Sequence, residues 1–173
     1  MTAVVHTKTL TIRALDESVL AAVRSATHQA AERALVGMRA EGGEPLRCCL
    51  RNALAGDEII LFGHSPALPA SPYREVGPVF AHAQACGGPA FHDTYPPDWV
   101  GRRQILRAYD RRGWIHHASR EHDGFDALAA IEAVLEDPEV VEVHSRNVVY
   151  GCFMFVVTRR GETGFATHDV AAP

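Results

Sequence analysis

The chain has 173 residues, of which 47% are hydrophobic, a length and composition typical of one compact domain, so we expect a single domain over residues 1–173. Its 17 basic and 21 acidic residues give a net charge of -4, which argues against a broad nucleic-acid-binding surface. The sequence begins without a signal-peptide pattern and contains no run of roughly 20 apolar residues, so we expect a cytoplasmic protein without a membrane span.

In the first part of the chain, the residue pattern predicts one strand, then a helix, then two further strands. Alternating apolar residues predict a strand over Lys8–Arg13. From Asp16, a suitable N-cap, to about Met38, apolar residues recur every three or four positions, which predicts an amphipathic helix. Two further strands are expected over Leu46–Arg51 and Glu58–Phe62.

The second part predicts a helix followed by a closing hairpin. Strands are expected over Ile105–Tyr109 and Trp114–Ser119, a helix over Asp126–Leu135, and a hairpin within Glu139–Arg159 that fills the middle of the sheet. The tail, residues 161–173, should be frayed. Together these elements predict an α+β fold, with a mainly antiparallel sheet of about six to eight strands and two helices packed on one face.

On several of these strands, polar residues occupy alternate positions and therefore point to one face of the sheet. If the helices cover the face that carries Leu106 and Val143, the opposite face carries five polar residues: Arg47, Arg51, Arg107, Tyr109 and His144. Guanidinium groups bind carboxylate or phosphate in bidentate fashion, and tyrosine and histidine can donate to the same anion. The pattern predicts a pocket for a small anionic molecule. The ordinary alternative is a solvated outer face of an antiparallel sheet.

Two neighbouring segments add residues to this pocket. The proline-rich loop over residues 63–78 contains Tyr73 and Arg74, which could reach a ligand or pack on the sheet edge. On the closing hairpin, Asn147 and Cys152 follow His144, an arrangement that admits a histidine-activated thiol. If the site is catalytic, His144 would be the general acid or base and Cys152 or Tyr109 its partner. The simpler interpretation of Cys152 is a small core residue.

The 10 histidines and four cysteines raise the question of a metal. The cysteines, Cys48, Cys49, Cys86 and Cys152, form no C-x-x-C pair, so we expect free thiols. Adjacent residues of a strand face opposite sides, which should keep Cys48 apart from Cys49 and His116 apart from His117. No zinc-ligand spacing is present, so the sequence assigns no metal ligands and identifies no cofactor. A metal site would have to combine distant residues: His64, His82, His92 or the His116–His117 pair with Cys49 or Cys152.

Four segments of the chain also follow the pattern of a known family. They are CLRNALAGDEIILF (residues 49–62), SPYREVGPVF (71–80), LRAYD (106–110) and VHSRNVVYGC (143–152). In order and spacing they resemble the uncharacterised bacterial family catalogued as domain of unknown function 1203, over most of residues 45–160. The chain departs from the family pattern at Pro45-Leu46-Arg47, where the family has Pro-Cys-Arg, and at Arg146-Asn147, where it has His-Asn. The resemblance supports the choice of candidate residues and implies no particular reaction.

Three functions therefore compete. The leading hypothesis is a pocket for a small anionic ligand, lined by Arg47, Arg51, Tyr73, Arg74, Arg107, Tyr109, His144 and Asn147. The second is an interaction module whose arginine-bearing face docks an acidic protein or a second copy of the chain, forming a homodimer. The third is a metal enzyme with histidine ligands.

Overall fold

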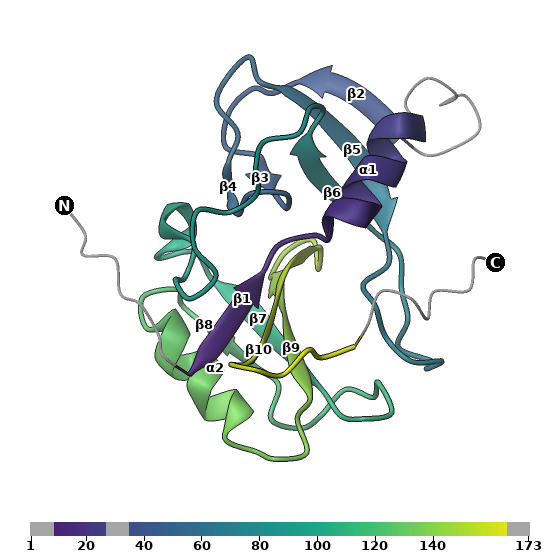
Figure 1. Ribbon diagram of the computed structural model, residues 1–173. Coiled ribbons are helices and arrows are strands. Elements are labelled where there is room, and N and C mark those ends of the chain that lie inside the picture. The colour runs from purple at the N-terminus through teal and green to yellow at the C-terminus, as the bar shows by residue number, and fades with distance from the viewer. Residues whose placement is uncertain (1–8, 27–34, 166–173) are drawn as a thin grey trace.

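The structure, a computed structural model, describes residues 9–26 and 35–165. Over these residues, ten strands form two five-stranded sheets, and each sheet carries one α-helix (Figure 1). The predicted α+β class and its mainly antiparallel strands are confirmed. The strands divide between two sheets, so the two helices cover different sheets instead of sharing one face.

The first sheet is built around the closing hairpin. Its strands run in the order β1 (Leu10–Arg13), β10 (Phe153–Arg159), β9 (Glu142–Asn147), β7 (Gln104–Tyr109) and β8 (Arg120–His122). Every neighbouring pair is antiparallel. Helix α2 (Ala127–Leu135) covers one face, and the predictions for this helix and for the central hairpin are confirmed.

The second sheet comes mainly from the middle of the chain. Its strands run in the order β2 (Leu35–Arg39), β5 (Glu58–His64), β6 (Gly77–His82), β3 (Pro45–Leu46) and β4 (Arg51–Asn52). The β3–β6 pair is parallel, and the other pairs are antiparallel. Helix α1 (Glu17–Ala26) packs on this sheet through Leu20 and Val23.

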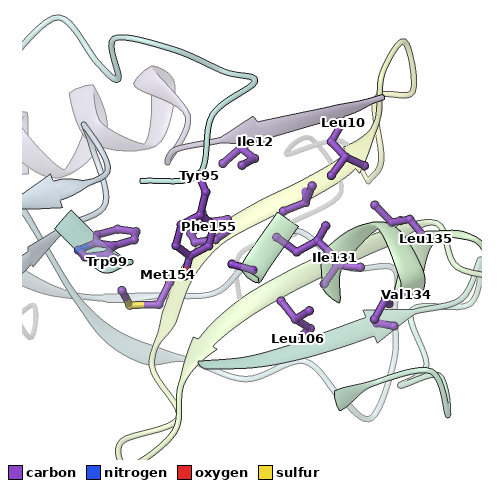
Figure 2. Packing of buried hydrophobic residues seen from close by; sticks show 14 of the residues in the cluster. Leu10, Ile12, Tyr95, Trp99, Leu106, Ile131, Val134, Leu135, Met154 and Phe155 are labelled. Atoms are coloured by element: carbon purple, nitrogen blue, oxygen red, sulfur yellow. The ribbon is translucent and has the colours of Figure 1, made fainter. Parts of the chain in front are cut away.

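The larger hydrophobic core lies between the first sheet and α2 (Figure 2). Ile131, Val134 and Leu135 of α2 share this core with the strand residues Leu106 and Phe155. At one end of this core, the short 3-10 helix η2 (Pro97–Trp99) inserts Trp99, whose indole is fully buried and stacks on Phe155 with ring centroids 5.9 Å apart. The indole Nε1 donates to Asn52 Oδ1 at 3.0 Å, which links this core to β4.

The predicted helix from Asp16 to Met38 is too long. Helix α1 is described only to Ala26, and residues 27–34 of the prediction lie outside the described residues. Residues 35–39 form strand β2, which pairs with β5 in antiparallel register. Pairing with residues 19 to 27 positions away overrides the helical periodicity there, because hydrogen bonds to a neighbouring strand decide the backbone of a short segment.

Two predicted strands are also shorter than expected. Residues 47–50 form a turn between β3 and β4, with Leu50 at a φ of 56°, so Leu46–Arg51 is not a continuous strand. In the segment Trp114–Ser119, only Ile115 bridges to another strand, at Tyr109, and the rest turns back toward β8. Both corrections matter for function, because the alternation of side chains assumed for these segments does not apply.

Candidate functional site

Polar side chains cover the face of the first sheet opposite α2. Register pairs Arg107 of β7 with His144 of β9, and Tyr109 with Glu142. Arg146, two positions beyond His144, shares this face. The parity of the sequence therefore places Arg107, Tyr109 and His144 together, as predicted. We call these five residues and Glu75, described next, the sheet cluster.

The loop between β5 and β6, residues 65–76, crosses this face. Its Glu75 carboxylate accepts a hydrogen bond from Arg107 Nη1 at 2.8 Å, and the same oxygen pairs with Arg146 Nη1. The Arg146 side chain is only 4% exposed, whereas that of Glu75 is 44% exposed. The loop is held at its middle by Ser71, whose hydroxyl donates to Gly113 O at 2.8 Å. One carboxylate thus bridges two guanidinium groups at the sheet surface.

The inner part of the sheet cluster is buried. His144 Nε2 lies 2.6 Å from Glu142 Oε1, and neither side chain is more than 2% exposed. Burial lowers the pKa of His144, and the Glu142 carboxylate opposes this effect. Burial likewise lowers the pKa of Arg146. Four buried polar atoms of the cluster have no hydrogen-bond partner among the described residues: Tyr109 Oη, His144 Nδ1, Arg146 Nε and Arg146 Nη2.

Arg47 and Arg51 do not join this cluster, because Arg47 lies in the turn between β3 and β4 and Arg51 lies on β4 of the second sheet. Arg47 is 2% exposed and donates through Nε to Phe153 O of the first sheet at 2.7 Å, and through Nη1 to Pro45 O. Its burial lowers its pKa to about 10. Arg47 is thus a structural link between the two sheets, whereas Arg51 is exposed on β4.

The other predicted site residues shape turns around the cluster. Tyr73 packs edge-on against Trp114 with ring centroids 6.2 Å apart. The Arg74 amide closes a turn by donating to Ser71 O at 3.2 Å. In the turn between β9 and β10, Asn147 Oδ1 accepts the amides of Val149 and Tyr150 at 3.0 and 3.1 Å, and Cys152 Sγ lies 3.6 Å from Tyr150 O. These contacts hold loops in place.

A second group of reactive side chains lies on the second sheet. Cys48 and Cys49 of the turn at residues 47–50, His82 at the end of β6, and Cys86 of the following loop each offer a ligand atom within 4.8 Å of the others. We call these four residues the thiol cluster. The expectation that Cys48 and Cys49 face opposite sides is wrong, because they lie on a turn, where their sulfurs are 3.9 Å apart.

The thiol cluster has polar neighbours on one side and a cavity on the other. His82 Nε2 faces Asp57 Oδ2 at 3.5 Å, and the His82 amide donates to Cys48 Sγ at 3.3 Å. The hydrogen bond from Cys48, together with the positive charge of Arg51, lowers the pKa of the Cys49 thiol, whereas the same contact raises that of Cys48. Cys49 and Cys86 line a cavity of about 380 Å³ under the loop at residues 86–98.

A third group consists of buried His116, exposed His117 and half-buried Asp137, and its two histidines line a cavity of about 760 Å³. The two imidazole rings are 4.1 Å apart between centroids. The expectation that these adjacent histidines face apart is wrong, because His117 begins a turn in place of the predicted strand. His64 and His92 join neither group: His64 packs against Phe153, and His92 Nδ1 contacts Ile12 O at 3.4 Å.

The sheet cluster and the thiol cluster fall within one stretch of recognisable sequence. The family model for a protein of unknown function, DUF1203, matches residues 43–159, about two thirds of the chain. The chain belongs to the DUF1203 family. No curated protein and no solved structure matches it. None of the helices that the structure describes is long and apolar enough to cross a membrane.

Leu46 and Arg146, two positions at which the sequence was expected to depart from the family pattern, have clear structural roles. Leu46 is fully buried in the core of the second sheet. Arg146 contributes one of the two guanidinium groups that meet Glu75. Arg146 thus adds a second guanidinium group to the sheet cluster.

Sequence reasoning missed five residues of these clusters: Glu75, Glu142, Arg146, Cys48 and Cys86. Glu75 and Arg146 stand inside the segments that resemble the DUF1203 family. Glu75 lies in a loop, however, and a loop has no periodic pattern from which its contact with a strand could be predicted. Cys48 and Cys86 join Cys49 and His82, a pairing that the sequence offered only as one of several options. The available signals were the adjacent cysteines and the H-x-x-x-C spacing from His82 to Cys86.

Proposed function

We propose that this DUF1203 chain binds a small anion, a carboxylate or phosphate, at Arg107 and Arg146. The observation that carries the proposal is the Glu75 carboxylate, which bridges both guanidinium groups. In this proposal Glu75 stands where a carboxylate or phosphate oxygen of the ligand would bind. Guanidinium groups held on neighbouring strands at fixed spacing are well suited to this recognition.

Partial burial strengthens such a site. The Arg107 side chain is 24% exposed and that of Arg146 is 4% exposed, so their charges are less screened by water and salt than those of surface arginines. Further donors stand beside them: Arg146 Nε and Nη2 are buried without a well-formed hydrogen bond among the described residues, and the Tyr109 hydroxyl lies next to the Arg146 guanidinium. An anion with more oxygens than a glutamate side chain would satisfy more of these donors.

An external anion would compete with Glu75. The Glu75 side chain is 44% exposed and belongs to a loop rather than to a strand, so it can move away without breaking either sheet. Displacement would cost the Glu75 ion pairs, and the measured affinity for a ligand would be reduced by that cost. The His144 and Glu142 side chains are shielded from solvent and pack on the inner part of the same sheet face.

The competing hypothesis of a docking face fits the same residues less well. A docking surface on the order of 1,000 Å² needs arginines that reach a partner. Arg146 and Arg47 are buried, and Arg51 lies on the other sheet. A bound small molecule needs only the two arginines that already share a carboxylate.

The test is anion binding by the Glu75→Gln variant, measured by calorimetry with inorganic phosphate and with succinate. We expect Glu75→Gln to bind one of them about tenfold more tightly than the unmodified chain, since losing a charged competitor is worth roughly 1–2 kcal/mol. Arg107→Gln should abolish this binding. The matched control is Glu121→Gln, which breaks the exposed pair with Arg103 and should leave anion affinity unchanged. If Glu75→Gln and Glu121→Gln bind both anions equally weakly, the proposal is wrong.

A further inference from the structure

The thiol cluster has the dimensions of a tetrahedral metal site. With zinc–sulfur bonds of about 2.3 Å and zinc–nitrogen bonds of about 2.0–2.1 Å, tetrahedral geometry requires ligand atoms about 3.8 Å apart for two sulfurs and about 3.6 Å apart for sulfur and nitrogen. The two sulfurs of Cys48 and Cys49 are 3.9 Å apart, and they lie 3.5 and 3.8 Å from His82 Nδ1. Three ligand atoms therefore already hold the required spacing.

The fourth ligand comes from a separate segment. Cys86 brings its sulfur within 4.8 Å of the other three ligand atoms. The four residues thus join a tight turn, the end of a central strand and the start of a long loop. Three cysteines and one histidine are a standard ligand set of structural zinc sites.

The neighbours of the cluster also fit a metal. A histidine that binds zinc through one ring nitrogen usually offers the other to a carboxylate, and His82 Nε2 faces Asp57 at 3.5 Å. The His82 amide donates to Cys48 Sγ at 3.3 Å, a contact that stabilises a thiolate. Three thiolates around Zn²⁺ leave one net negative charge, and the Arg51 guanidinium lies close enough to Cys49 to interact with it.

We infer that Cys48, Cys49, His82 and Cys86 bind one Zn²⁺ ion. The site is closed, with four protein ligands, so its role is structural rather than catalytic. The ion would fasten the turn at residues 47–50 and the loop at residues 86–98 to β6. The cavity beside Cys49 and Cys86 would give zinc a path to the ligands. This site is separate from the anion site of the sheet cluster, so either proposal can fail without the other.

The first experiment measures zinc in the full chain, prepared under reducing conditions without a histidine tag, emptied with a chelator and reloaded with Zn²⁺ alone. We expect one zinc ion bound with high affinity per chain. For Cys49→Ser and Cys86→Ser we expect less than a tenth of that zinc content. Cys152→Ser is the matched control, because this thiol lies outside the cluster, and it should bind zinc like the unmodified chain. His117→Ala removes one residue of the group His116, His117 and Asp137 and should also leave the tight site intact.

The second experiment works on the unmodified chain and does not depend on the folding of variants. Co²⁺ in a tetrahedral thiolate site gives intense ligand-field bands and sulfur-to-metal charge-transfer bands, which Zn²⁺ should remove by displacement. A weak octahedral spectrum without charge transfer would overturn the inference. So would equal zinc binding by Cys86→Ser and Cys152→Ser, or a disulfide among Cys48, Cys49 and Cys86 in place of metal in freshly purified protein.

Discussion

Glu142 and His144 form a pair that is closed off from solvent, with Oε1 and Nε2 only 2.6 Å apart and the two side chains 2% and 0% exposed. Both project from β9 onto the same face of the sheet. Glu142 Oε2 also accepts the Phe165 amide at 2.9 Å, so residues beyond β10 are tied to this pair. The tail at residues 161–173 was predicted to be frayed, but its described part, residues 161–165, is held to the sheet at Phe165, and residues 166–173 lie outside the described residues.

Glu142→Ala should strongly destabilise the fold. Removing one member of a buried hydrogen-bonded pair leaves the other without a partner, which costs about 3 kcal/mol or more of the free energy of unfolding. Urea denaturation followed by circular dichroism measures this loss. Glu121→Ala, which removes an exposed carboxylate, should cost less than about 1 kcal/mol. Equal losses in the two variants would contradict the assigned role of Glu142.

Acid should destabilise the fold through its buried histidines. Burial is the largest cause that lowers the pKa of His144 and of His64, the latter to about 4. Because an unfolded histidine titrates near 6.5, the unfolded chain binds a proton between pH 6.5 and about 4 that folded His64 does not. Above this window the titration does not reduce the free energy of unfolding. As the pH drops through the window, the free energy of unfolding falls by at most about 1.4 kcal/mol per pH unit for each histidine.

The contribution of His64 can be isolated by measuring the free energy of unfolding at pH 7 and pH 5. His64→Gln should lose less stability than the unmodified chain over this interval, since glutamine does not titrate. His117→Gln, at an exposed position, is the control and should keep the dependence of the unmodified chain. A His64→Gln profile as steep as the unmodified one would show that this histidine is not the sensor.

Arg47→Met should destabilise the junction of the two sheets. Arg47 Nε donates to Phe153 O at 2.7 Å from a position only 2% exposed, and a hydrogen bond from a charged group is worth about 1.5–3 kcal/mol. Thermal denaturation should therefore show a clear loss for Arg47→Met. Arg51→Met, on the exposed strand β4, should change stability by less than about 0.5 kcal/mol. Similar melting of both variants would refute the structural role of Arg47.

The two tryptophans of the chain should report on different environments. Trp99 is fully buried against Phe155, whereas Trp114 is 44% exposed. Trp114→Phe should therefore leave blue-shifted emission, and Trp99→Phe should leave red-shifted emission. Trp99→Phe should also cost about 2 kcal/mol, because it removes buried volume and the hydrogen bond to Asn52. Red-shifted emission from the Trp114→Phe variant would place Trp99 in solvent instead.

Local sequence patterns were reliable where a segment depends mainly on its neighbours in the chain. The hairpin of β9 and β10 and helix α2 carry strong periodic signals, and both form as predicted. Parity alone placed Arg107, Tyr109 and His144 on one face, because side chains alternate strictly along a strand. The family segments were likewise visible in the sequence, and the family match bears them out.

By itself, the sequence determined the α+β class, the family and half of the sheet cluster. Only the tertiary structure decided that residues 35–39 leave the helix for β2, that Glu75 meets two arginines, and that Cys49 lies beside His82. The physical reason is distance along the chain. Each of these contacts joins segments more than 15 residues apart through a turn or loop, and side chains in such segments have no periodicity to say which way they point.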